Sequence, residues 1–307
     1  MNSKRNFEEV SYERQSENFN ECILGGKDAY ISRTWLETDT VEAWRHQRVY
    51  QTIDPILKTE PEAKWLTVGD GRYGTDAKYI LDKGCEALPT DISDYLLKEA
   101  KDVGYIPDYR KENAESLTFK DSEFDYVFCK GSYHHFPRPM KALYEMLRVA
   151  RKGVVLIEPN DKYINNHHSK FTEKFFRNLK DILKTLIKRN RNKHSFEEVG
   201  NYKYSISRRE IEKVALGLNY KIVAFKGIND AYEKGVENEK LSVNGPFQKA
   251  IKKSISFKNF LVKIGFMDYT LLTAIIFKQE PSKNLLHNLS INGFKIVNLP
   301  GNPYIPD

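Results

Sequence analysis

The 307-residue sequence has few cysteines and no long hydrophobic run. Its three cysteines, Cys22, Cys85 and Cys129, lie far apart and form no Cys-x-x-Cys pair. This pattern argues against a disulfide framework and against a zinc site. No apolar run reaches the roughly 18 residues of a membrane span, and the first residues lack the apolar core of a signal peptide. We therefore expect a cytoplasmic protein without stable membrane insertion.

A strong excess of one charge is also absent. The chain carries 49 Lys and Arg against 42 Asp and Glu, a net charge of +7, which favours an anionic partner only moderately. Phosphorylated small molecules, nucleic acid and anionic lipid all remain open on charge alone. A hydrophobic content of 40% is enough for a sizeable core, and the length suits one large domain with additions or two small ones.

The segment 64–77 organises the sequence. A short apolar run ending at Val68 leads into residues 69–74, Gly-Asp-Gly-Arg-Tyr-Gly, and then into a helix start. Glycine lets the backbone turn sharply and approach a ligand closely, and the first turn of a helix presents unpaired N–H groups. The segment therefore predicts a nucleotide site. Its Gly-x-Gly-x-x-Gly spacing also matches the dinucleotide fingerprint, although a single match of this kind is weak.

Strands and helices alternate along residues 41–280. We expect strands near residues 64–68, 85–90, 105–110, 124–130, 153–157, 220–225 and 269–277. Such alternation is typical of a doubly wound α/β fold, here a mostly parallel, seven-stranded, Rossmann-like sheet. Residues 1–40 are predicted to form an irregular or short-helical arm. Residues 281–307 are predicted to form an extension that contains a hairpin around Asn292-Gly293.

Residues 160–206 interrupt this alternation. An apolar stripe between Phe171 and Leu186, with Lys and Arg side chains off the stripe up to Lys193, predicts a basic amphipathic helix. Such a helix can lie on a membrane, but packing on the sheet domain as a lid is the better interpretation. The basic residues would also suit phosphates of nucleic acid. Since no recognisable nucleic-acid module accompanies them, we expect no nucleic-acid partner.

Polar or glycine-containing segments follow successive predicted strands. The glycine turn follows the first strand, Asp91 the second, residues 113–115 (Asn-Ala-Glu) the third and residues 133–137 (Tyr-His-His-Phe-Pro) the fourth. Residues 158–160, Glu-Pro-Asn, follow the fifth. In this order the segments resemble a class I S-adenosylmethionine-dependent methyltransferase. The resemblance covers residues 60–160 well and extends loosely to residue 280.

The resemblance implies S-adenosylmethionine as the cofactor and assigns residues to it. Asp91 would accept hydrogen bonds from both ribose hydroxyls, and Asn113 and Ala114 would border the adenine. Lys130 and Gly131 would lie under the methionine carboxylate or the methyl group. The full set that it assigns to the cofactor is Gly69, Asp70, Gly71, Gly74, Asp91, Asn113, Ala114, Lys130 and Gly131.

Two residues depart from the family pattern. Thr67 occupies the position where an acidic residue is usual, and Tyr73 displaces the third glycine of the usual turn. Both departures leave open which group holds the methionine ammonium. Asp70 and a residue of the N-terminal arm are the candidates.

The exact form of residues 67–77 narrows the resemblance to methyltransferases of bacterial surface-polysaccharide clusters. That narrower resemblance implies O-methylation of a sugar, most plausibly a nucleotide-diphosphate sugar. A sugar hydroxyl must lose its proton as the methyl group is transferred, and a neutral histidine can accept it. His134 and His135, on the loop after the fourth strand, are the predicted catalytic residues, and His167 and His168 are rivals.

Alternatives from other classes remain. An NAD(P)-dependent oxidoreductase would explain the glycines and Asp91, but it leaves Asn113 and the paired histidines without a role. Nucleic acid or another small molecule is an alternative acceptor. Asp161 with His167 and His168 could bind a divalent metal, although we predict no metal site. A homodimer is an open alternative for the assembly.

Overall fold

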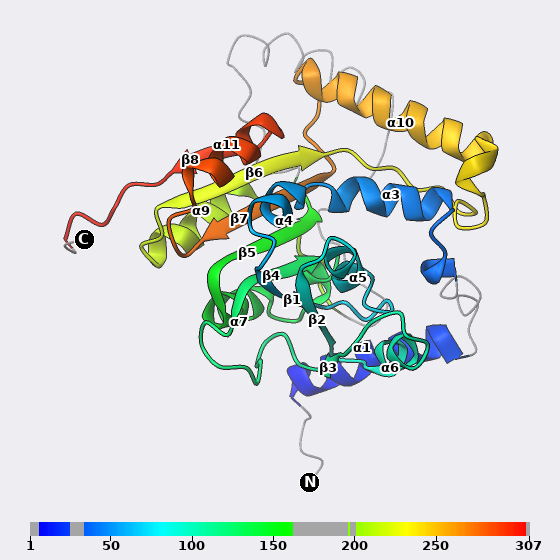
Figure 1. Ribbon diagram of the computed structural model, residues 1–307, viewed down its shortest axis with the longest axis horizontal. Helices are drawn as coiled ribbons and strands as arrows, with labels where there is room; N and C mark the ends of the chain where they lie inside the picture. The colour runs from blue at the N-terminus through cyan, green and yellow to red at the C-terminus, as the bar shows by residue number, and fades with distance from the viewer. Residues whose placement is uncertain (1–5, 25–33, 162–195, 197–200, 305–307) are drawn as a thin grey trace.

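The computed structural model of the protein (Figure 1) describes residues 6–24, 34–161, 196 and 201–304. Its strands are β1 (Lys64–Val68), β2 (Glu86–Asp91), β3 (Arg110–Lys111), β4 (Phe124–Lys130), β5 (Ala150–Pro159), β6 (Ile222–Ile228), β7 (Leu271–Phe277) and β8 (Lys295–Asn298). They form a sheet in the order β3-β2-β1-β4-β5-β7-β6-β8. Strands β1 to β5 pair in parallel, whereas β7 is antiparallel to both β5 and β6, and β8 is antiparallel to β6.

Some of the helices begin at a side-chain cap. Thr40 Oγ1 accepts a hydrogen bond of 3.0 Å from Ala43 N, and Ser207 Oγ accepts one of 3.1 Å from Glu210 N. The described helices, including three short 3₁₀ turns (η), are α1 (Phe7–Leu24), η1 (Thr34–Leu36), α3 (Val41–Tyr50), α4 (Asp54–Thr59), α5 (Thr75–Leu81), α6 (Tyr95–Asp102), η2 (Tyr133–His135), α7 (Pro139–Val149), α9 (Arg208–Gly217), η3 (Leu241–Val243), α10 (Pro246–Lys263) and α11 (Lys283–Ile291).

Helices cover both faces of the sheet, as predicted for a doubly wound fold. Successive strand residues point to opposite faces, so Trp65 and Leu66, both fully buried, belong to different apolar clusters. Leu66 packs in the cluster that α7 and α9 cover, and Trp65 in the cluster that α4, α5 and α11 cover. The cores on the two sides hold the carboxyl ends of β1, β2 and β4 at one edge.

The predicted C-terminal hairpin is wrong, and the sheet has eight strands rather than seven. The first half of the expected hairpin is the helix α11, because Ser282 Oγ accepts a hydrogen bond of 3.1 Å from Leu285 N and starts it. Leu285 and Leu289 lie one helical turn apart and are fully buried beside α4. Asn292-Gly293 then ends the helix and leads into β8, which pairs with β6.

Two smaller expectations also differ. Part of the N-terminal arm, predicted to be irregular or short-helical, is the 18-residue helix α1. The third strand is only the two-residue β3, at the end of the predicted range. The predicted insertion falls almost wholly outside the described residues, and so do His167 and His168. None of the helices that the structure describes is long and apolar enough to cross a membrane.

Candidate cofactor site

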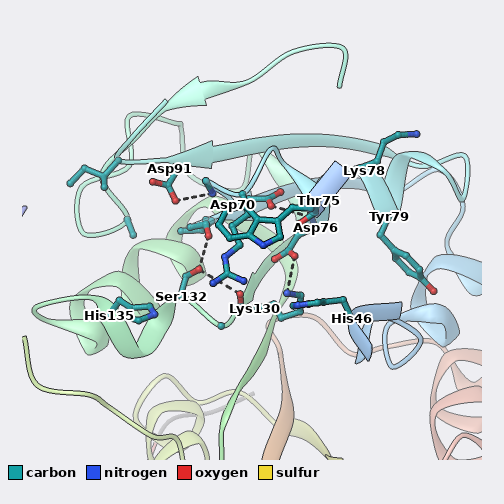
Figure 2. A pocket seen from close by; sticks show the side chains of 18 of the residues that line it. His46, Asp70, Thr75, Asp76, Lys78, Tyr79, Asp91, Lys130, Ser132 and His135 are labelled. Carbon is teal, nitrogen blue, oxygen red and sulfur yellow. Dashed lines mark hydrogen bonds and ion pairs between the residues drawn. The ribbon is translucent and has the colours of Figure 1, made fainter. Parts of the chain in front are cut away.

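A cavity of about 450 Å³ opens at the carboxyl ends of the parallel strands. The turn after β1, the end of β2, residues 112–115, residues 130–132 and residues 135–137 line it from the sheet side, and α1, η1 and α3 contribute residues to its lining. Figure 2 shows Asp91 on one side of the cavity and His46 with Lys130 on another. In open α/β sheets this edge is where ligands bind.

Eight of the nine residues predicted to bind the cofactor line this cavity. The exception is Gly74, which precedes α5 and faces Pro89 and Ile106 instead. Its φ of +69° lies in the left-handed region, so Gly74 serves the turn into the helix. Sequence spacing could not separate a glycine that faces a ligand from one that shapes the turn behind it.

Close approach explains the other two glycines of the turn. A Cβ at Gly69 would lie 2.3 Å from Ser132 Cβ, and one at Gly71 would lie 2.7 Å from Asp91 Cγ. Both distances are shorter than non-bonded carbon atoms allow. The turn after β1 is therefore packed directly against the segments that follow β4 and β2.

Tyr73 accounts for one departure from the family pattern. Its φ of +58° is in the left-handed region, where a residue with a side chain costs about 1–2 kcal/mol. The side chain is 1% exposed and packs with Leu96, Leu97 and Ile106. Burial of this large ring offsets the backbone cost, so a glycine is not required here.

Asp91 presents its carboxylate to the turn after β1. Its Oδ2 accepts a hydrogen bond of 2.9 Å from Gly71 N, and its Oδ1 accepts one of 2.9 Å from Ser93 N. Burial raises the pKa of Asp91 to about 6, although these backbone hydrogen bonds oppose the rise. The carboxylate is thus fixed on the cavity wall.

Asp70 is a buried cap of α5, which also explains Thr67. The side chain of Asp70 accepts hydrogen bonds from Asp76 N (3.0 Å), Ala77 N (2.9 Å) and Thr67 Oγ1 (2.8 Å). Burial, followed by the nearby Asp76 carboxylate, raises the pKa of Asp70 well above its usual range. Asp70 is only 2% exposed and its carboxylate already accepts three hydrogen bonds, so it is a poor partner for the methionine ammonium.

Lys130 belongs to a nearly buried network beside the glycine turn. Its Nζ lies 3.1 Å from Asp76 Oδ1 and 4.7 Å from the centroid of the Tyr50 ring. The Tyr50 hydroxyl donates to the same oxygen of Asp76 over 2.6 Å. Asp76 lines the cavity, and the sequence-based assignment missed it. Its signal was an acidic residue in the first turn of the helix that follows the glycines.

The two predicted catalytic histidines occupy different environments. His134 Nδ1 lies 2.7 Å from Oε2 of Glu158, which is fully buried. Glu158 Oε1 accepts hydrogen bonds of 2.9 Å from Ser132 N and Tyr133 N. His135 lines the cavity, whereas His134 is not among its lining residues. The two rings are adjacent, with centroids 4.0 Å apart.

A third histidine, His46 of α3, also lines the cavity and was not predicted. Its Nε2 lies 3.0 Å from Glu42 Oε1, and Arg45 pairs with Glu42 and with Asp230. Burial, and then the charge of Lys130, lower the pKa of His46, although Glu42 opposes them. The imidazole is thus neutral near pH 7 and can accept a proton. Its only sequence signal was the Glu-x-x-x-His spacing, which places both side chains on one helix face.

Residues 113–115 connect the cavity to the N-terminal arm. Asn113 Oδ1 accepts a hydrogen bond of 2.9 Å from Glu115 N, and Ala114 is 8% exposed. Glu115 Oε2 accepts hydrogen bonds of 2.6 Å from the Tyr12 hydroxyl of α1 and from Arg138 Nε. The arm is therefore held over this side of the cavity. Among the described residues, no group of three or more His, Cys, Asp or Glu side chains is placed to hold a metal ion.

Comparison with known proteins decides the class of this site. Residues 66–157, which include β1, the glycine turn and most of the cavity, match the family model of a methyltransferase domain. The predicted enzyme class, an S-adenosylmethionine-dependent methyltransferase, and its cofactor are thereby confirmed at the level of the domain.

Curated relatives match less than half of the chain. A sarcosine/dimethylglycine N-methyltransferase from Halorhodospira halochloris is 25% identical over 145 residues, covering 45% of this chain and 52% of that enzyme. A demethylmenaquinone methyltransferase from Renibacterium salmoninarum is 31% identical over 122 residues, covering 40% of this chain and 51% of that enzyme. The chain thus spans about half the length of these two relatives.

Solved structures resemble the chain more distantly. Magnesium protoporphyrin IX methyltransferase from Synechocystis PCC 6803, with bound S-adenosylmethionine, has a TM-score of 0.48 at 12% identity and covers 89% of this chain and 100% of that chain. An S-adenosylmethionine-dependent methyltransferase from Methanosarcina mazei has a TM-score of 0.45 at 16% identity and covers 74% of this chain and 98% of that chain.

Removal of the Asp91 carboxylate tests the cofactor assignment. We expect Asp91→Ala to weaken S-adenosylmethionine binding by about 1–3 kcal/mol, the usual loss for hydrogen bonds to a charged group. Since burial raises the pKa of Asp91 to about 6, wild-type affinity should also fall as the pH drops through 6 and the acceptor is protonated. Titration calorimetry between pH 5 and pH 8 would measure both effects.

Asp91→Asn is the matched control for the pH effect. The amide keeps the size of the side chain but does not titrate, so its affinity should be weaker and nearly constant over the same pH range. Equal affinities of wild type and Asp91→Ala at pH 7.5 would contradict the assignment of Asp91 to the ribose.

Proposed function

We propose that the protein is an S-adenosylmethionine-dependent O-methyltransferase whose acceptor is a nucleotide-diphosphate sugar. One observation carries the cofactor half of this proposal. Asp91, held by Gly71 N at 2.9 Å, forms the wall of a cavity of about 450 Å³ inside the methyltransferase domain. A carboxylate in that place can accept two ribose hydroxyls.

Other observations support the proposed acceptor. The form of residues 67–77 resembles enzymes that methylate sugars of surface polysaccharides, and the net charge of +7 favours an acceptor that bears phosphate. On the side of the cavity away from Asp91 (Figure 2), Lys130 contributes a cationic side chain and His46 an imidazole to the lining. That combination suits an anionic molecule with a hydroxyl group to be methylated.

The chemistry requires alignment and one proton acceptor. When S-adenosylmethionine is bound, its sulfonium supplies an activated methyl group: an O–C bond forms, the C–S bond breaks and the hydroxyl proton leaves. In this proposal His135, on the cavity wall, accepts that proton. His134 positions the loop through its 2.7 Å contact with Glu158. The residues around the glycine turn hold the donor in line with the acceptor oxygen.

Mass spectrometry of ligand retained through purification and calorimetry with S-adenosylmethionine test the cofactor. We expect binding of S-adenosylmethionine and no binding of NAD⁺ or NADP⁺, and a nicotinamide ligand would overturn the proposal. Methyl-tritiated cofactor with a panel of UDP-, GDP- and dTDP-sugars tests the acceptor. Label transferred only to non-sugar acceptors, such as glycine or sarcosine, would leave the cofactor assignment intact and overturn the sugar.

A further inference from the structure

Helix α10 exposes a row of large apolar side chains. Phe257, Phe260 and Ile264 are 60%, 56% and 41% exposed. Phe257 and Phe260 are three residues apart and Ile264 follows four residues later, so all three lie on one side of the helix. Scattered exposed apolar residues are ordinary, but three neighbours on one helix surface form a patch.

The opposite side of α10 already packs on the protein. Ile251 and Ile255 are buried together with Val41 of α3 and with Val236. In Figure 1, α10 (orange) runs along the outer edge of the molecule, beyond α3. The exposed row therefore faces away from the fold, and the fold does not need it for packing.

The same helix is strongly and uniformly basic. Residues 246–263 contain five lysines and no acidic residue. Four of the lysines are exposed, and in the described part of the chain none of them forms an ion pair: Lys249, Lys252, Lys253 and Lys263.

The acidic residues near α10 are engaged elsewhere. Glu239 accepts hydrogen bonds from Phe247 N (3.0 Å) and Gln248 N (2.7 Å) at the start of the helix, and Asp230 pairs with Arg45. Asp268, beyond the C-terminal end, accepts a hydrogen bond of 2.8 Å from Tyr269 N. In the described part of the chain, none of these three carboxylates forms an ion pair with an exposed lysine of α10.

We propose that the α10 face, defined as Lys249, Lys253, Phe257, Phe260, Lys263 and Ile264, docks on an anionic lipid surface. A helix that combines lysines with exposed aromatic and aliphatic residues lies in the interface of a bilayer, with its apolar side chains below the headgroups and its lysines at the phosphates. The docking is peripheral and reversible. It does not depend on which acceptor the cavity binds.

The composition of the face favours lipid over two other occupants. A nucleic-acid backbone would use the lysines but would leave Phe257, Phe260 and Ile264 in water, without stacking partners in a duplex. A second copy of the chain would bring the lysines of one α10 face against those of the other, and like charges repel. A bilayer interface satisfies both kinds of side chain on a convex helix.

Vesicle sedimentation tests the proposal with the full chain. We expect binding to vesicles of equal parts phosphatidylglycerol and phosphatidylcholine, weakening with added salt, and little binding to pure phosphatidylcholine. Phe257→Ser/Phe260→Ser and, separately, Lys249→Gln/Lys253→Gln should each raise the lipid concentration for half-binding by about tenfold or more. Val103→Ser/Ile291→Ser is the matched control, because it removes two equally exposed apolar residues (64% and 67%) elsewhere and should bind as wild type does.

A fluorescent reporter checks that α10 itself enters the interface. Phe260→Trp should show a blue-shifted emission with anionic vesicles, whereas Val103→Trp should not. The proposal is overturned if the wild-type chain does not bind anionic vesicles. It is also overturned if both α10 double variants bind them as wild type does, or if duplex DNA at equal charge concentration displaces the vesicles completely while the Phe260→Trp emission stays unshifted.

Discussion

Glu158→Ala is expected to lower the free energy of unfolding by about 3–5 kcal/mol, the usual loss when one member of a buried charged network is removed. The Glu158 side chain is fully buried and accepts hydrogen bonds from Ser132 N and Tyr133 N while it contacts His134 Nδ1. Its removal leaves these groups without their acceptor inside the protein. Chemical denaturation at 25 °C would measure the loss.

Two further variants separate the effect of burial on the free energy of unfolding from the effect of the carboxylate charge. Glu158→Gln keeps an oxygen for Ser132 N and Tyr133 N, so it should lose clearly less stability than Glu158→Ala. Glu86→Ala removes an exposed carboxylate from β2 and should change the free energy of unfolding by less than about 1 kcal/mol. If Glu158→Ala is as stable as Glu86→Ala, the contacts of Glu158 with residues 132–134 do not stabilise the loop that follows β4.

The sequence located Glu158 but not its function. Its position after a predicted strand placed it at the ligand-binding edge, because parallel strands end together there. Strands β4 and β5 are neighbours, with Lys130 paired to Ile157. This pairing brings Glu158 beside the loop that follows β4. The order of residues along the chain does not reveal which side chain contacts a neighbouring loop, since that depends on the strand register and on the side-chain rotamer.

The side of the cavity formed by α3 was less accessible to sequence reasoning. The helical spacing of α3 was recognised, but its place over the cavity depends on contacts with distant residues such as Val236 and Ile251. His46 and Glu42 therefore gave no sequence signal beyond their spacing. The C-terminal error has a similar origin, because an Asn-Gly pair suits both a hairpin and the end of a helix. Burial of Leu285 and Leu289 decided for the helix.

His135→Ala is expected to lower methyl-transfer turnover by about 10²–10⁴-fold, the usual contribution of general base catalysis. Cofactor affinity should stay within about twofold of wild type, because the imidazole acts on the acceptor rather than on the cofactor. Single-turnover kinetics with an accepted sugar nucleotide and calorimetry with S-adenosylmethionine would measure rate and affinity separately.

His134→Ala and His46→Ala are the matched variants, because each removes one imidazole of the same site region. His134 is not part of the cavity lining, so His134→Ala should reduce the rate much less than His135→Ala does. His46 lines the cavity and its Nε2 is held by Glu42. If His46→Ala loses the rate while His135→Ala keeps it, the base is His46. Burial lowers the pKa of His46, so the acid limb would then lie below the ordinary histidine value of about 6.5.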